Sequence, residues 1–356
     1  MARELVETGD ELDSISLFTG LGGLDIGLEK AGFSFRLALE NDPHRVAVLS
    51  ANRPSWNATA GDIREVSSTT ILRRARLERS DIALISGGPP CQPFSKAAFW
   101  VPNRFRPYWH DKRRSLLREF ARVVIGCKPK VFVLENVAGL AYATNRRYLD
   151  LFRRKIQKAG YLVSSQVLNS ADYGVPQRRE RLFVVGSREG IKFRFPKPTH
   201  RRSSQKLTIR GLKPPVTTGK AIGDLDDEVL LDSERVRGKW GHLLPKIPPG
   251  QNYLFFTKER GHPRPLFRWR SKYWSFLAKL NPDDTSWTIP ARPGPYTGPF
   301  HWRNRRLRIS EIMRLQTFPR SWILPSEPGT ARSALGDATP PREAQAIGQA
   351  IVRQFL

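Results

Sequence analysis

Residues 14–23 read Ser-Ile-Ser-Leu-Phe-Thr-Gly-Leu-Gly-Gly, a short strand pattern that runs directly into a glycine-rich turn. A helical pattern follows, with Leu24, Leu28 and Ala31 on one face and Gly32 as a typical helix stop. This order predicts the opening of a nucleotide-binding βαβ unit, because glycines let a ligand approach the backbone at the helix N-terminus. The spacing is not the GxGxxG of dinucleotide-binding proteins, so the turn alone does not identify the ligand.

Further strands place acidic side chains where a nucleotide would need them. The strand at 34–39 ends at Glu40, about 20 residues past the turn, where a carboxylate can accept hydrogen bonds from ribose hydroxyls. Asp62 stands in a Gly-Asp-Ile triplet at the next strand end. The apolar runs at 82–85 and 131–134 are typical of buried parallel strands. We therefore expect an α/β fold with a Rossmann-like sheet.

The apolar run at 82–85 leads into GGPPCQPFS at 87–95, whose glycines and prolines predict a stiff, irregular loop. Cys91 in this loop is one of only two cysteines in the 356 residues. A lone cysteine is often a buried structural residue, whereas a position between prolines on a Gly-rich loop favours a nucleophile. Glu135 follows the strand at 131–134 and is expected at the same sheet edge, as an acid partner.

The charge of the chain points to a polyanionic partner. Sixty Lys and Arg against 33 Asp and Glu give a net charge of +27 and a pI near 10.8, which favours nucleic acid binding. No apolar run is long enough to span a membrane, and the N-terminus has no signal-peptide pattern. Two cysteines and six scattered histidines indicate neither a disulfide framework nor a metal site. We expect a cytoplasmic protein without a metal.

The alternation of strands and helices fades after residue 187, and Pro, Gly, Arg and Trp become frequent. We expect a first domain of residues 1–187 plus 307–356 and a smaller, loop-rich domain of residues 188–306. The second domain would present arginines and aromatic side chains to nucleic acid. The expected nucleic acid contacts lie in this domain and in the loop around Cys91: Ser95, Arg104, Arg106, Arg268, Arg270 and Arg292.

Taken in order, these segments resemble the motifs of the DNA (cytosine-5) methyltransferase family, over nearly the whole chain. The resemblance implies a Rossmann-like methyltransferase domain with a target-recognition domain at 188–306. The matching segments are FTGLGGLDIGLEKAGF (18–33), GGPPCQPFS (87–95), PKVFVLENVAGL (129–140), ADYGVPQRRERLFVVG (171–186), RRLRISEIMRLQTFP (305–319) and ALGDATPP (334–341).

The resemblance implies S-adenosylmethionine as methyl donor and covalent catalysis on a flipped-out cytosine. Cys91 would attack C6 of the base, Glu135 would hold a proton at N3, and Arg181 would hydrogen-bond O2 with Arg179 beside it. The cofactor residues implied are Phe18, Gly20, Gly22, Gly23, Glu40, Asp62, Pro89 and Asp337. Asp337 is a departure, because the family usually has Asn there.

The setting implied is a bacterial type II restriction-modification system. A monomeric enzyme would methylate double-stranded DNA at the nucleoid in the cytoplasm and protect it from a cognate restriction endonuclease, its functional partner. No rule connects the second domain to a particular DNA sequence, so the target site is not predicted.

Three alternatives remain open. A tRNA cytosine-5 methyltransferase would carry a Cys-Phe-Thr motif, whereas Phe255 precedes Phe256 and Thr257 here. A DNA-binding homologue without catalysis would be consistent with Asp337, although Cys91 is present. A dinucleotide oxidoreductase is disfavoured by the missing GxGxxG and by the basic charge.

Overall fold

The computed structural model describes residues 11–79, 81–90, 116–203 and 210–356. The chain forms two compact units, the first consisting of Met1–Leu168, Glu180–Pro196 and Ala344–Leu356, the second of Asn169–Arg179 and Lys197–Glu343. Residues 307–343 therefore belong to the second compact unit, although we expected them in the catalytic domain. The functional division at residues 187 and 307 stays a prediction.

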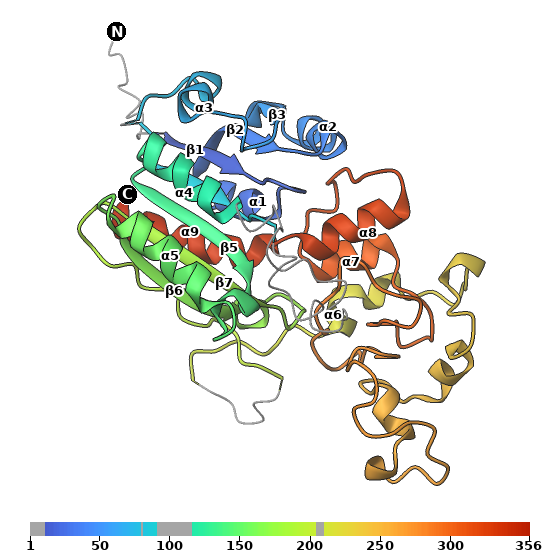
Figure 1. Cartoon of the computed structure of the whole chain (residues 1–356). Helices are drawn as coiled ribbons and strands as arrows, with labels where there is room; N and C mark the ends of the chain where they lie inside the picture. The colour runs from blue at the N-terminus through green and yellow to red at the C-terminus, as the bar shows by residue number, and fades with distance from the viewer. Residues whose placement is uncertain (1–10, 80, 91–115, 204–209) are drawn as a thin grey trace. The chain divides into compact units, whose positions relative to one another are not determined.

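The first unit contains a seven-stranded sheet, counted over the described residues, in the order β3-β2-β1-β4-β5-β7-β6 (Figure 1). The pairs β3–β2, β2–β1, β1–β4 and β4–β5 are parallel, whereas β7 runs antiparallel to β5. The strand order reverses between β1 and β4, which is where open α/β sheets bind ligands. The strands are β1 (Leu12–Leu17), β2 (Phe33–Glu40), β3 (Ala58–Ala60), β4 (Leu84–Gly87), β5 (Val131–Val137), β6 (Leu162–Asn169) and β7 (Glu180–Ser187).

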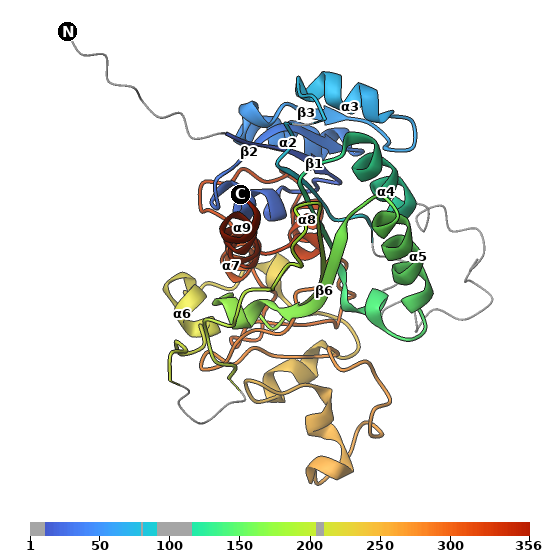
Figure 2. The same ribbon diagram turned by 90° about the vertical axis from the view of Figure 1, so that its left-hand side faces the viewer.

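Helices cover both faces of this sheet, which confirms the predicted α/β fold. Figure 2 shows α4 and α5 on one side of the sheet and α9 on the other. Helix α9 packs closely on α1 and the residues after it, because a Cβ at Gly348 would lie 3.1 Å from Leu28 Cδ2 and 2.7 Å from Ala31 Cβ. The helices of this unit are α1 (Gly23–Glu29), α2 (Pro43–Asn52), α3 (Ser68–Ala75), α4 (Leu116–Cys127), α5 (Arg146–Gln157) and α9 (Pro341–Phe355), which starts in the second unit.

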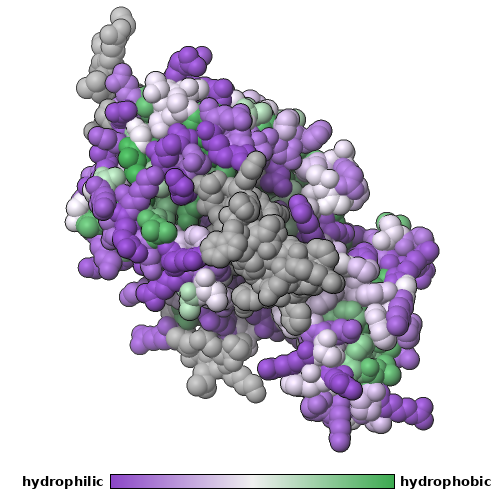
Figure 3. Space-filling view, viewed as in Figure 1, coloured by the Kyte–Doolittle hydropathy of each residue, from purple (hydrophilic) through white to green (hydrophobic). Residues whose placement is uncertain are grey.

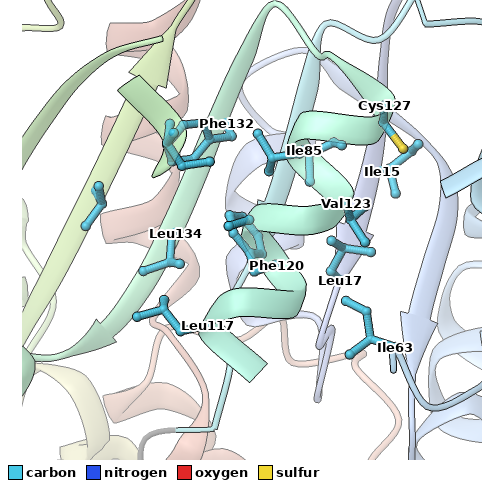
Figure 4. Packing of buried hydrophobic residues seen from close by; sticks show 14 of the residues in the cluster. Ile15, Leu17, Ile63, Ile85, Leu117, Phe120, Val123, Cys127, Phe132 and Leu134 are labelled. Carbon is cyan, nitrogen blue, oxygen red and sulfur yellow. The ribbon is translucent and has the colours of Figure 1, made fainter. Parts of the chain in front are cut away.

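The core lies between the sheet and the face formed by α3, α4 and α5. Phe120 of α4 packs against Phe132 of β5 and Leu17 of β1 lies nearby, all three fully buried (Figure 4). At Gly87 a Cβ would lie 2.7 Å from the Leu17 carbonyl oxygen and 2.8 Å from Phe120 Cε2. Only glycine fits at this position, because both neighbours are held by the core. The end of β4 is thus pressed against β1.

The second unit has a separate aromatic core and few regular elements. Phe256, Phe267 and Phe276 form edge-on contacts in this core, with ring centroids 5.8–6.4 Å apart where they meet. A buried ion pair joins Arg305 to Glu311 at 2.7 Å. The predicted helix at 309–316 is present as α7 (Ile309–Leu315), and the others are α6 (Thr218–Ile222) and α8 (Pro328–Asp337). None of the helices in the described part of the chain is both long and apolar enough to cross a bilayer.

Candidate functional site

The turn after β1 has the backbone geometry that the glycine-rich sequence predicts. Phe18, Gly20 and Gly22 have positive φ values of 55°, 60° and 79°. Gly22 is the N-cap residue of α1, and a Cβ there would lie 2.9 Å from Trp56 Cζ3. A side chain at Gly22 is therefore excluded both by conformation and by space. Gly20 and Gly23 belong to the turn that follows β1, one of the two strands at the switch point of the sheet.

Glu40, at the end of β2, holds this turn with its carboxylate. One oxygen accepts a hydrogen bond from Gly20 N at 2.7 Å, and the other accepts from Asn41 N at 3.0 Å and Asp42 N at 3.1 Å. The residue is 8% exposed. A carboxylate has about four acceptor positions, so Glu40 can still accept from a ribose hydroxyl.

Asp62 lies beyond β3 and pairs with Arg64, whose Nε is 2.9 Å from Oδ1 and 3.0 Å from Oδ2. The hydrogen bond from Arg64 holds the pKa of this carboxyl below its usual range. The carboxylates of Glu40 and Asp62, the Phe18 ring and the glycine backbone together offer the acceptors and the aromatic surface that S-adenosylmethionine needs. The residues present fit the expected cofactor, and their roles stay predictions.

Glu135 and Arg181 form an ion pair beside the residues that lead to Cys91. Arg181 Nε lies 3.0 Å from Glu135 Oε1, and the two side chains are only 13% and 10% exposed. The pair follows from the antiparallel register of β5 and β7, in which Val137 is opposite Arg181 and Glu135 is opposite Phe183. A Cβ at Gly88 would be 3.3 Å from Glu135 Oε2, so the glycine lets the loop pass close to the carboxylate.

Asn136 also holds this loop, a function that the sequence did not suggest. Its Nδ2 donates a hydrogen bond of 3.0 Å to the carbonyl oxygen of Pro89, and the residue is 3% exposed. Its side-chain oxygen accepts from Val137 N at 3.0 Å. The only signal in the sequence is its place between Glu135 and Val137, in a segment that resembles a family motif.

Cys91 lies outside the described residues, as do Ser95, Arg104 and Arg106. The other cysteine, Cys127, is fully buried in the core of the first unit. Burial raises the pKa of its thiol to about 11, so at neutral pH it is an unreactive thiol. A cysteine nucleophile in this chain would therefore have to be Cys91, because Cys127 is the alternative and is inert.

Arg179 and Asp337 belong to the second unit, where the side chain of Arg179 contacts the backbone of Asp337. The Arg179 guanidinium is fully buried and donates from Nη2 to the carbonyl oxygens of Gly336 at 2.8 Å and Asp337 at 3.2 Å. It also donates to the Ile289 carbonyl oxygen at 3.4 Å. These bonds join three segments of the second unit. The expected parts of Arg179 in the base pocket and of Asp337 in the cofactor site are untested.

The other expected nucleic acid contacts lie on the surface of the second unit. Arg268, Arg270 and Arg292 are exposed. Trp269 is 38% exposed, and the guanidinium carbons of Arg260 and Arg270 lie 6.0 and 5.8 Å from its ring centroid. Hydrophilic residues cover most of the described surface in Figure 3. An exposed aromatic ring between arginines is suited to contact with a nucleic acid backbone or base.

Comparison with known proteins agrees with this arrangement. Residues 12–353 match the model of the family described as C-5 cytosine-specific DNA methylase. The chain is 39% identical over 369 aligned residues to the type II methyltransferase M.SacI of Streptomyces achromogenes, covering 97% of this chain and 94% of the relative. It is 30% identical to the type II methyltransferase M1.HphI of Haemophilus parahaemolyticus, covering 96% of this chain and 87% of the relative.

A solved structure supports the fold. A protein encoded within a prophage of E. coli has a TM-score of 0.66 and 23% sequence identity, covering 96% of this chain and 99% of that one. At this identity the likeness concerns the fold, which is the predicted Rossmann-like methyltransferase fold.

Proposed function

The chain belongs to the C-5 cytosine-specific DNA methylase family, and from this premise we propose how its residues carry out the reaction. The enzyme transfers a methyl group from S-adenosylmethionine to carbon 5 of cytosine in DNA. We propose covalent catalysis in which the Cys91 thiolate adds to C6 of the base. The observation that carries the proposal is the Glu135–Arg181 ion pair, which lies next to Gly88, three residues before Cys91.

The addition of a thiolate to C6 pushes an electron pair into the pyrimidine ring, where it has to be accepted. Glu135 in its protonated form would give a proton to N3, so that the electron density at C5 rises without a negative charge on the ring. Arg181 would donate to O2 from the same side, since it is already paired with Glu135. Once C5 carries the transferred methyl group, its proton leaves to solvent and the C5–H electron pair forms the C5=C6 double bond again. The Cys91–C6 bond breaks with its electron pair on the sulfur, and the proton on N3 returns to Glu135.

In this proposal the cofactor would be held by the turn after β1. S-adenosylmethionine supplies an electrophilic methyl group when it is bound. Glu40 would accept from the ribose hydroxyls while it keeps its hydrogen bond to Gly20 N. Phe18 would contact the adenine, Asp62 its amino group, and the backbone of Gly20 the methionine part. Gly22, Gly23, Pro89 and Asp337 complete the proposed cofactor set.

Cytosine in a stacked duplex hides C6, so the base has to leave the helix at a cost of a few kcal/mol. Phosphate contacts by a protein of net charge +27 would offset that cost. We assign target recognition to residues 188–306. The exposed Arg268, Arg270 and Arg292 support this assignment, and Ser95, Arg104 and Arg106 would contact DNA from the loop around Cys91.

A serine at position 91 tests the nucleophile. The Cys91→Ser variant should lose methylation by about 10³-fold or more while DNA binding is kept, because a serine hydroxyl is a far weaker nucleophile than a thiolate. DNA with 5-fluorocytosine at the target prevents loss of the C5 proton and should trap a denaturation-resistant complex with the wild type but not with Cys91→Ser. Bisulfite sequencing of methylated DNA from expressing cells would first identify the target.

The matched control is Cys127→Ala, which removes the other thiol. This variant should form the trapped complex as the wild type does, because Cys127 lies buried in the core. A trapped complex with Cys91→Ser, or its loss in a folded Cys127→Ala protein, contradicts the nucleophile assignment.

The names of the relatives support a setting in restriction-modification. We infer that the enzyme acts as a monomer at the nucleoid and protects host DNA from a cognate endonuclease. The rival substrate is tRNA, and labelled S-adenosylmethionine offered with duplex DNA and with tRNA separates the two. Label on tRNA alone would contradict the proposed substrate.

A further inference from the structure

A buried carboxylate follows the proposed cofactor turn in the sequence. Asp25, in the first turn of α1, is 1% exposed. Ser86 Oγ, on β4, donates a hydrogen bond of 2.8 Å to its Oδ1. The hydroxyl of Ser16, on β1, interacts with the same carboxylate. Asp25 therefore touches both strands of the switch point between β1 and β4.

The contacts of Ser16 extend this link into the turn itself. Ser16 Oγ lies 2.9 Å from Thr19 Oγ1, and Thr19 N donates to the Leu39 carbonyl oxygen at 3.4 Å. Thr19 immediately precedes Gly20, whose N–H is held by Glu40. The polar groups from Asp25 to the turn are thus connected through buried hydroxyls, in a region where the surrounding side chains are apolar.

On its other side the link reaches the end of β4, which precedes Cys91 in the sequence. Ser86 is fully buried and is followed by Gly87 and Gly88, which lead to Cys91. Gly87 fits tightly against Leu17 and Gly88 against Glu135, so a shift of β4 at Ser86 would be transmitted along the strand. The carboxylate of Asp25 is therefore placed to hold two functional segments in one register.

The electrostatics suggest that the carboxylate has a function. In the described residues no Lys or Arg forms an ion pair with Asp25, and burial, opposed by the hydroxyls of Ser16 and Ser86, raises its pKa to about 6. Its charged form is thus disfavoured in the fold, since an unpaired buried charge is unfavourable.

We propose that Asp25 is a positioning residue that couples the cofactor turn, through Ser16, to the strand before Cys91, through Ser86. The inference rests on the proposed function, because it assigns methyl-donor binding to the turn and the nucleophile to the loop. Asp25 itself touches neither the donor nor the base. It keeps the donor site and the catalytic loop aligned.

The test measures S-adenosylmethionine binding by calorimetry and DNA methylation at saturating donor, on the full chain. Ser86→Ala and Asp25→Ala should each weaken donor binding and lower kcat by about 10-fold, the effect of losing one charged hydrogen bond. The double variant should be no worse than Asp25→Ala alone, because both changes break one link. Asp25→Asn keeps an acceptor for Ser86 and should bind the donor within about threefold of the wild type.

Ser14→Ala is the matched control, since Ser14 is an equally buried hydroxyl on β1 that bonds to the Leu12 carbonyl oxygen at 2.8 Å. It should leave both readouts within about twofold. Wild-type affinity and kcat in a folded Ser86→Ala protein, or an equal loss in Ser14→Ala, overturns the inference. If Asp25→Ala does not fold, Ser86→Ala alone decides. A wild type that binds no S-adenosylmethionine contradicts the proposed function instead, so the two failures are distinguishable.

Discussion

At the scale of one residue, the raised pKa of Asp25 predicts how the stability of the protein depends on pH. Its pKa of about 6 in the fold lies above the ordinary value of 3.8, so the group stabilises the fold below pH 4 and this contribution is lost as pH rises through 6. The difference of about two units corresponds to about 3 kcal/mol. Asp25→Asn should therefore raise the free energy of unfolding at pH 8 by up to that amount and change it little at pH 4.

Urea unfolding of both proteins at the two pH values measures the difference. The groups around the carboxylate are the hydroxyls of Ser16 and Ser86 and the carboxylate of Glu29, which adds to the upward shift of the pKa. If Asp25→Asn shifted stability equally at pH 4 and pH 8, the buried charge would not be the cause.

At the scale of an element, the end of β4 is fixed by different neighbours at successive residues. Ser86 bonds to Asp25, Gly87 fits against Leu17 and Gly88 against Glu135. Gly87→Ala should lower the free energy of unfolding by about 1–3 kcal/mol, because its Cβ would overlap the main chain of β1. Chemical denaturation of the variant measures this decrease. Gly223→Ala is the control, since nothing lies within 4 Å of a Cβ there. Equal stability of the two variants would contradict the tight packing of β4.

The elements show what the sequence can and cannot predict. Unbroken apolar runs predicted β4 and β5, because strands buried on both faces are mostly apolar. Helix α8 was not predicted, since Pro328–Asp337 has few apolar residues and two glycines. The antiparallel direction of β7 depends on long-range pairing, which local pattern does not encode. The sequence does not predict the environment of Asp25 for the same reason, because the hydroxyl partners of its carboxylate come from β1 and β4, which are distant in the sequence or belong to another element.

The candidate site was predictable where a residue's function depends on its place at a strand end. Glu40 lies at the end of β2 as expected, and the glycine turn has its positive φ values. Glu135 lies within β5, because this strand continues to Val137 instead of ending at residue 134. The hydrogen bond between Asn136 and Pro89 depends on the approach of β5 to the residues after β4, and no spacing in the sequence reveals it. The same holds for Arg179, whose backbone partners are distant segments of the second unit.

At the scale of the whole molecule, a net charge of +27 predicts that DNA affinity depends steeply on salt. Each phosphate neutralised by an arginine releases a counterion, so the slope of log K against log salt falls in magnitude by about one for each arginine–phosphate pair that a mutation removes. Removing exposed arginines that have no described carboxylate partner should therefore flatten the slope. Arg268→Gln with Arg270→Gln should reduce its magnitude by about 2, measured by fluorescence anisotropy on duplex DNA at several salt concentrations.

The control changes the same number of charges where the protein has already neutralised them. Arg303 pairs with Asp226 at 2.7 Å, and Arg237 pairs with Asp232. Arg303→Gln with Arg237→Gln lowers the net charge by the same two units, and should leave the slope nearly unchanged because these guanidiniums are engaged by carboxylates. Local phosphate contacts predict a difference in slope between the two double variants. If both variants flattened the slope equally, the overall electrostatic field of the protein would govern binding instead. A difference confined to Arg268 and Arg270 would locate the DNA-binding surface around Trp269, and so connect the charge of the whole chain to one face of the second unit.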